Sequence, residues 1–210
     1  MVCIGITGGN NFRDLFFALY RRAFIGCVAE MEIQKLVVGL LQTNCYLAWG
    51  EDKKAIVIDP GDDADYIENT IRDLNLRPKI ILTTHGHYDH LLAVTELKLA
   101  YQIPFAIHRN DLPLVFRYKQ VKPDKFLQEG DEVEDLKVIY LGEHSPGSVG
   151  FYNSKEKIIF SGDILFANGI GTHVTSKAIA KFLALPKETL IFPGHEESFT
   201  LTDWRQPEFV

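Results

Sequence analysis

The sequence contains little cysteine, no long apolar run and no excess of positive charge. Its three cysteines, Cys3, Cys27 and Cys45, form no CxxC pair, which argues against a disulfide framework and a zinc ribbon. We therefore expect reduced thiols and a cytoplasmic protein. No apolar stretch approaches the ~20 residues that span a bilayer, and charged residues interrupt the N-terminal apolar segment, so it is not a convincing signal peptide. The formal net charge of −6 argues against a nucleic-acid-binding surface.

Length and composition predict one globular domain that follows an N-terminal extension. A chain of 210 residues, 46% hydrophobic and 24% charged, can bury one sizeable core. Residues 1–30 are rich in aromatic residues and differ from the rest, so we expect an extension that takes no part in catalysis. A weaker alternative is an amphipathic helix that docks on a partner subunit or a membrane surface. Residues 31–210 form the expected domain.

The densest group of titratable side chains lies in residues 84–90, with the sequence THGHYDH. This segment follows the apolar run 79–83, which we expect to be a strand. Alternate side chains of an extended segment share a side, so His85 and His87 can converge on one ion, while Asp89 and His90 can reach a second. Imidazole nitrogen and carboxylate oxygen are ligands for zinc, iron and similar divalent ions. The segment therefore predicts a metal site.

Three later strand ends supply further candidate ligands. His144 lies in the Gly/Pro turn GEHSPGS, and Asp163 and His195 each follow a glycine at the end of an apolar run. Glycine allows a sharp change of direction and a close approach of the backbone to other groups. Each of the three residues alone is compatible with an ordinary polar turn. Together with residues 84–90, they indicate one site built at the ends of several strands.

Hydrophobic periodicity predicts strands first and then strands mixed with helices. Strands are expected at 36–41, 45–49, 55–58, 79–83, 104–108, 136–141, 149–152, 157–160 and 189–192, and helices at 64–74, 89–101, 110–116 and 176–185. We find no internal repeat and no low-complexity tract. This order of elements suits two packed sheets with helices on their outer faces.

The motifs HGHYDH, HSPGS, FSGDILF and FPGH occur in an order that resembles the metallo-β-lactamase superfamily. The closer resemblance is to the small hydrolases of the glyoxalase II (hydroxyacylglutathione hydrolase) group, and it covers roughly residues 31 to 199. It implies an α+β fold for residues 31–210, a four-layer αββα sandwich with the metals in a cleft at one edge of the sheets. It also implies two divalent metal ions, with zinc expected first and iron or manganese as alternatives.

The resemblance assigns a role to each candidate ligand. The first ion is expected to bind His85, His87 and His144. The second ion is expected to bind Asp89, His90 and His195. The carboxylate of Asp163 is expected to bridge the two ions. Asp59 resembles a residue that braces the metal loop and fixes an imidazole. A plain Asp-Pro-Gly turn explains Asp59 equally well.

Three further residues are candidates for contact with the substrate or its surroundings. Tyr88 occupies the variable position of the metal motif and either lines the mouth of the pocket or packs there. Asn168 lies in the segment after Asp163 that fits the family. His173 lies where Thr172-His173-Val174 replaces the usual Arg-Thr-Asp continuation, and is either a substrate contact or an exposed loop histidine.

The implied activity is hydrolysis of a thioester or a related acyl bond by a metal-bound hydroxide. Asp89 is the expected catalytic residue, because it can orient that hydroxide or shuttle its proton. One alternative is a mononuclear non-haem iron persulfide dioxygenase with His85, His144 and Asp163 as its triad. Another is a non-catalytic protein, stabilised by metal, that binds a partner. The expected partner is a small acyl or thioester substrate, with a homo-oligomer left open. Because the chain ends at Val210, we do not expect the C-terminal helical region with which eukaryotic glyoxalase II enzymes grip glutathione.

Overall fold

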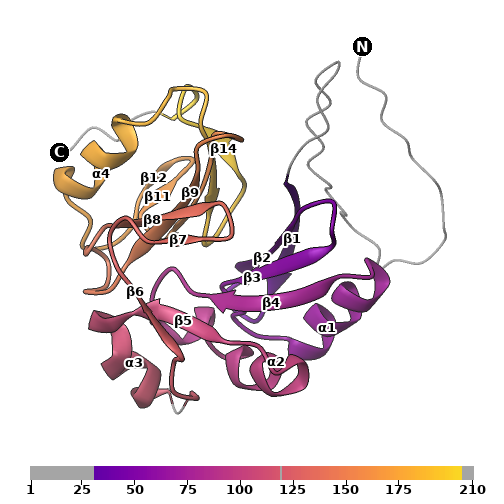
Figure 1. Ribbon diagram of the computed structural model, residues 1–210. Helices are drawn as coiled ribbons and strands as arrows, with labels where there is room; N and C mark the ends of the chain where they lie inside the picture. The colour runs from indigo at the N-terminus through magenta and orange to yellow at the C-terminus, as the bar shows by residue number, and fades with distance from the viewer. Residues whose placement is uncertain (1–30, 119, 205–210) are drawn as a thin grey trace.

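The computed structural model describes residues 31–118 and 120–204, so the segment 1–30 lies outside the described residues. In this part of the chain the strands form two six-stranded sheets and one two-stranded ribbon (Figure 1). The first sheet has the order β1 (Glu32–Val38), β2 (Thr43–Trp49), β3 (Lys54–Ile58), β4 (Arg77–Leu82), β5 (Phe105–His108), β6 (Lys125–Leu127). Strands β1 to β3 are antiparallel, and β3 to β6 are parallel.

The second sheet comes from the second half of the chain. Its order is β14 (Phe199–Thr200), β13 (Leu190–Pro193), β10 (Ile158–Gly162), β9 (Val149–Asn153), β8 (Leu136–Tyr140), β7 (Glu132–Val133). Strands β10 and β13 are parallel, and the other neighbours are antiparallel. The ribbon pairs β11 (Leu165–Phe166) with β12 (Gly169–Ile170).

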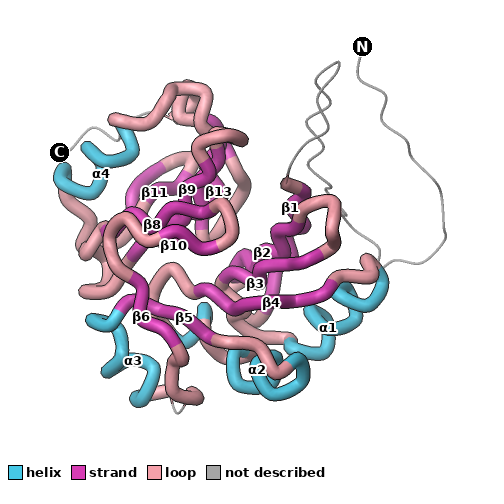
Figure 2. Tube along the Cα trace, in the orientation of Figure 1, coloured by secondary structure: helices cyan, strands magenta, loops and turns pink. Residues whose placement is uncertain are grey.

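Helices cover the outer face of each sheet (Figure 2). The first sheet carries α1 (Ala64–Asp73), α2 (Val94–Tyr101) and α3 (Leu112–Arg117), and the second carries α4 (Ser176–Leu183). Short 3-10 turns, η1 (Tyr88–His90) and η2 (Arg109–Asp111), precede α2 and α3. In α1, Ile67, Thr70 and Ile71 are buried at helical spacing, which fixes the face that packs on the sheet.

Three separate apolar cores lie between these four layers. Strand β3 shows how the sequence builds them, because its residues alternate between two cores. Ala55 and Val57 pack towards the helices of the first sheet, while Ile56 and Ile58 pack between the two sheets. A third core joins the second sheet to α4. The chain therefore has the four-layer αββα sandwich that the sequence predicted.

The loops that leave the strands at one edge of this sandwich carry the candidate ligands. Residues 84–90 follow β4 of the first sheet. His144, Asp163 and His195 follow β8, β10 and β13 of the second sheet. Each sheet thus contributes part of one site, and the regular strands hold the loops in place.

Candidate metal centre

All seven predicted metal ligands lie in one cluster. Three overlapping groups of ligand atoms could each hold an ion, and within each group the atoms lie within 4.8 Å of one another. The groups are His85, His87 and His144; His85, His90 and Asp163; and Asp89, His90 and His195. Residues more than 100 positions apart in the sequence therefore meet at one place.

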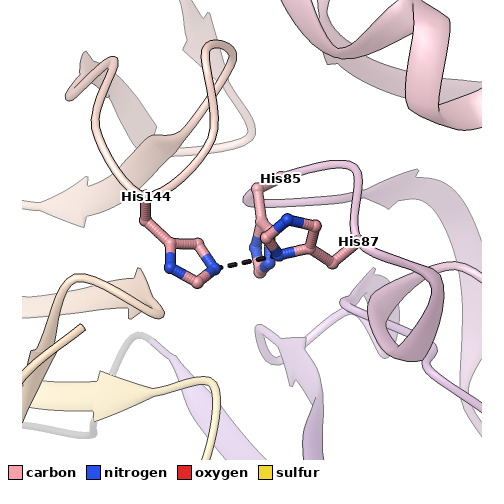
Figure 3. A group of neighbouring side chains, drawn as sticks. All are labelled: His85, His87 and His144. Carbon is pink, nitrogen blue, oxygen red and sulfur yellow. Dashed lines mark hydrogen bonds between the residues drawn. The ribbon is translucent and has the colours of Figure 1, made fainter. Parts of the chain in front are cut away.

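The first group brings together three imidazole rings from two different loops, and each pair of rings is close to perpendicular. Figure 3 shows His85 and His87 on one loop and His144 on the other, with the rings directed towards one another. The Nε2 atom of His144 lies 3.0 Å from Nδ1 of His87. The Nδ1 atom of His144 lies 3.3 Å from the carbonyl oxygen of Thr172, to which it can donate a hydrogen bond. In that tautomer Nε2 carries a free lone pair.

The second group surrounds the carboxylate of Asp89. Its Oδ2 atom lies 3.5 Å from His90 Nε2 and 3.4 Å from His195 Nε2. The Thr43 hydroxyl donates to the same oxygen at 3.0 Å. His195 Nδ1 lies 3.1 Å from the Leu41 carbonyl oxygen, to which it can donate, and Nε2 faces the cluster.

Asp163 lies between the two groups. Its Oδ1 atom is 3.5 Å from His90 Nε2, and its Oδ2 atom is 3.6 Å from His144 Nε2 and 3.4 Å from His195 Nε2. One carboxylate therefore faces ligands of both groups. Within the described chain, His85 Nε2, His90 Nε2 and Asp163 Oδ1 are buried without a hydrogen-bond partner. Buried lone pairs that converge in this way fit divalent cations, which would satisfy them together.

The protonation of the cluster follows from burial and from its carboxylates. Burial lowers the pKa of His85 well below its usual value, and it also lowers that of His144. Burial also opposes charge on His90, but Asp163 and Asp59 outweigh it and raise its pKa well above the usual value. For His195, hydrogen bonds to Asp163 and Asp89 outweigh burial and raise the pKa to about 9. Neutral His85 and His144 are ready to bind metal, whereas His90 and His195 must first lose a proton.

Asp59 makes more contacts than a plain turn residue requires. Its buried carboxylate accepts hydrogen bonds from the backbone N–H and the hydroxyl of Thr84, both at 2.7 Å. The same carboxylate lies 3.2 Å from Nδ1 of His90. Asp59 has a φ of 51°, an uncommon value for a residue other than glycine. The contacts thus support the bracing interpretation, in which Asp59 orients the His90 ring.

A second carboxylate, Asp111, also holds the loops of the cluster, and the sequence did not predict it. It is fully buried and accepts hydrogen bonds from Gly86 N at 2.8 Å, Gly147 N at 2.7 Å and Ser145 Oγ at 2.6 Å. These donors belong to the loops that carry His85 and His144, so one side chain ties the two loops together. A signal was present, because Asp111 is an acidic residue directly before the apolar residues of a helix. An acidic residue there is far more often an exposed helix start.

Strand β2 holds the loop of His195 from the opposite sheet. Asn44 donates from its side chain to the carbonyl oxygens of Pro193 at 3.0 Å and Glu196 at 2.8 Å. The Tyr46 hydroxyl donates to the Pro193 carbonyl oxygen at 2.6 Å. The sequence predicted a strand at 45–49, but no role for Asn44 or Tyr46. Its polar side chains, buried between apolar neighbours, were the available signal.

Two glycines allow the ligands to approach so closely. A Cβ atom at Gly194 would overlap the Asp163 carboxylate and crowd the His90 ring. Gly162 has a φ of +52°, and a Cβ there would meet the Thr84 side chain. The prediction that glycine precedes these ligands for reasons of close approach therefore has a direct structural basis.

The three remaining candidates are more exposed than the seven candidate ligands. Tyr88 is 41% exposed and borders a cavity next to Asp89, and its ring contacts Tyr118. Asn168 is exposed in the turn between β11 and β12. His173 is also exposed, and its carbonyl oxygen accepts a hydrogen bond from His144 N at 3.4 Å. Among described residues, His173 belongs to none of the three ligand groups.

The family model that matches this chain is that of the metallo-β-lactamase superfamily, over residues 38–195. The chain belongs to this superfamily. The matched span contains all seven candidate ligands, so the resemblance predicted from the sequence motifs is confirmed. The superfamily is one of metal-binding proteins, and the clusters of histidine and aspartate fit that membership.

Named relatives place the chain near one branch of the superfamily. A hydroxyacylglutathione hydrolase of Haemophilus influenzae is 31% identical over 201 residues, which cover 81% of this chain and 93% of that protein. A probable metallo-hydrolase of Bacillus subtilis is 33% identical over 208 residues, covering 86% and 98%. The crystal structure of TTHA1623 in a di-iron-bound form superposes with a TM-score of 0.75 at 33% identity, covering 80% of this chain and 94% of that one.

Proposed function

We propose that this protein is a metal-dependent hydrolase that cleaves a thioester or a related acyl bond. The observation that carries the proposal is the position of Asp163, whose two oxygens face His90 on one side and His144 and His195 on the other. A carboxylate shared in this way suits a centre with two ions. Similarity to a hydroxyacylglutathione hydrolase supports a thioester as the substrate class.

The two proposed ions would be held by the residues of the cluster. The first would take His85, His87 and His144, the second Asp89, His90 and His195, and Asp163 would contact both. When bound, such ions lower the pKa of water towards neutrality and polarise a carbonyl oxygen. This donor set suits zinc, which we propose first, and also iron or manganese. Similarity to a protein crystallised with two irons makes iron the foremost alternative.

Asp89 is the proposed catalytic residue. Hydrogen bonds from His195 and Thr43 and the charge of His90 outweigh the effect of burial, so the pKa of Asp89 lies below its usual value. It is therefore ionised at neutral pH and can accept a hydrogen bond or a proton from the attacking water. In the overall reaction the water oxygen bonds to the acyl carbon and the C–S bond breaks with its electron pair on sulfur. One proton of the water ends on the thiol.

The surroundings of the site complete the proposal. Residues 31–210 would form the hydrolase domain, with Asp59 as a brace and Tyr88, Asn168 and His173 around the substrate. The free, buried Cys45 is consistent with a cytoplasmic protein. Among the described residues, no helix has both the length and the apolar character to cross a membrane. The proposed partner is a small acyl substrate, and the net charge of −6 disfavours nucleic acid.

One experiment separates this function from its alternatives. The purified full chain would be analysed for bound metals and assayed with thioesters, lactones and persulfides, together with Asp163→Asn. Two ions per chain and thioester cleavage that Asp163→Asn abolishes support the proposal. One iron per chain with oxygen uptake on persulfides supports a dioxygenase instead. Metal-dependent folding without turnover of any of these substrates supports a non-catalytic protein.

A further inference from the structure

Glu143, the residue directly before the candidate ligand His144, connects the His144 loop to helix α4. Both of its carboxylate oxygens accept hydrogen bonds from Thr175: Oε1 from the hydroxyl at 2.6 Å, and Oε2 from the backbone N–H at 2.7 Å. Thr175 is the N-cap residue of α4, and its hydroxyl oxygen accepts from Lys177 N at 3.3 Å. Since α4 packs on the third core, Thr175 is a fixed point for the loop.

The segment 172–175 also contacts His144 itself. The carbonyl oxygen of Thr172 lies 3.3 Å from His144 Nδ1, and the carbonyl oxygen of His173 accepts from His144 N at 3.4 Å. His144 has a φ of 66° and His173 a φ of 58°. Residues other than glycine keep such left-handed conformations only where surrounding contacts hold them there. The backbone and the ring of His144 are therefore positioned by their neighbours in the fold.

Glu143 supports the cluster without being part of it. Among the described residues, Glu143 belongs to none of the three groups of ligand atoms, and both of its oxygens are engaged by Thr175. Hydrogen bonds to a carboxylate are stronger than those between neutral groups. Asp111 holds the part of the loop that follows His144, through Ser145 and Gly147. Glu143 holds the part that precedes it, so the ligand is fixed from both sides.

We infer that Glu143 is a positioning residue for the first metal ion. Its two hydrogen bonds with Thr175 keep the His144 loop against the segment 172–175, and this contact fixes the direction in which His144 presents Nε2 to the ion. Glu143 contacts neither metal nor substrate in this role. The inference rests on the proposed function, because it concerns an ion of the proposed centre. Outer partners that orient a metal-binding histidine typically change metal affinity by about 10–100-fold.

The test measures zinc affinity by chelator competition in the full chain and in three variants: Glu143→Ala, Thr175→Val and the double variant. Glu143→Ala should lower the affinity for one of the two ions by about 10-fold or more and leave the other unchanged. Thr175→Val removes one of the two hydrogen bonds and should lower the same affinity by at least ~3-fold. Because both residues act through one contact, the double variant should bind no more weakly than Glu143→Ala. Thr175→Val keeps the charge of Glu143, so its loss of affinity separates hydrogen bonding from attraction between carboxylate and cation.

Two control variants and a second readout complete the design. Thr175→Ser keeps both donors and should bind zinc like the wild-type protein. Glu132→Ala removes the same charge at an exposed position on β7 and should change neither affinity. Cobalt(II), unlike zinc with its filled d shell, absorbs visible light in bands that depend on ligand geometry. At saturating cobalt, Glu143→Ala should shift these bands, and Thr175→Ser and Glu132→Ala should not.

The outcomes distinguish this inference from the proposed function. Wild-type zinc affinities and cobalt bands in Glu143→Ala overturn the positioning role, even if its urea midpoint falls, because the pair then supports folding alone. A loss of affinity in Glu143→Ala that Thr175→Val does not share also overturns it, since charge alone would explain that result. In either case, thioester cleavage by the wild-type protein leaves the hydrolase intact. If the wild-type protein cleaves no thioester, the proposed function fails, and the metal affinities still decide the role of Glu143.

Discussion

Replacing Asp111 by asparagine tests whether the two loops of the first ion are held by one buried carboxylate. Asparagine keeps the shape but has a single acceptor oxygen, while three donors converge on Asp111. At least one of Gly86 N, Gly147 N and Ser145 Oγ is then left buried without a partner. Such a loss costs about 1–3 kcal/mol of folding free energy. Removing an outer partner of a metal ligand also weakens metal binding by about 10–100-fold.

Two measurements on the Asp111→Asn variant would check this reasoning. Urea unfolding of the metal-free protein gives the loss in stability, and competition with a coloured chelator gives the affinity of each ion. The affinity should fall for the ion held by His85, His87 and His144, because Asp111 connects the loops that carry His85 and His144. Asp73→Asn, an equal change of charge at an exposed position on α1, should change neither quantity. Wild-type stability and affinity in Asp111→Asn would refute the bracing role, and equal weakening of both ions would refute its selectivity.

Three other features of the metal loops make measurable predictions. Gly194→Ala should destabilise the protein by about 1–3 kcal/mol, because its Cβ overlaps Asp163; an unchanged urea midpoint would contradict this. Asp59→Asn should lower the affinity for the ion bound by His90 by about 10–100-fold, measured by chelator competition. An unchanged affinity would show that Asp59 has no role in binding that ion. The pKa of His195 is raised to about 9 in the folded chain, so its contribution to metal-free stability is present below about pH 6.5 and is lost as the pH rises through about 9. The urea midpoint should fall over that range while metal affinity rises; a midpoint that stays level would exclude this linkage.

The sequence predicted the fold and the cluster because both depend on strong local patterns. Long apolar runs located β2, β3, β4 and β9, and glycine before a ligand located Asp163 and His195. The short strands β6, β7, β11, β12 and β14 were missed, since two or three residues are too few to show a period of two. The helix predicted at 89–101 becomes a 3-10 turn and then α2 from Val94, because the ligands Asp89 and His90 occupy its first turn.

Contacts between distant loops could not be predicted in the same way. Asp111 and Asn44 act by accepting from or donating to backbone groups far away in the sequence, and no local pattern reports such a partner. The turn at Leu40 was also misjudged, because residues 36–41 were expected to form one strand, whereas β1 ends at Val38. The exposure of Leu40 follows from that early end, and only the folded chain shows it.

The division of the ligands between the two sheets makes each cation a removable crosslink between the halves of the chain. His85, His87, Asp89 and His90 come from the first half, and His144, Asp163 and His195 from the second. A bound ion therefore opposes separation of the two halves. By mass action, an ion present at about 1,000 times its dissociation constant raises the free energy of unfolding by about 4.1 kcal/mol. Scarcity of the ion in a cell would then reduce how much folded protein survives as well as how fast it works.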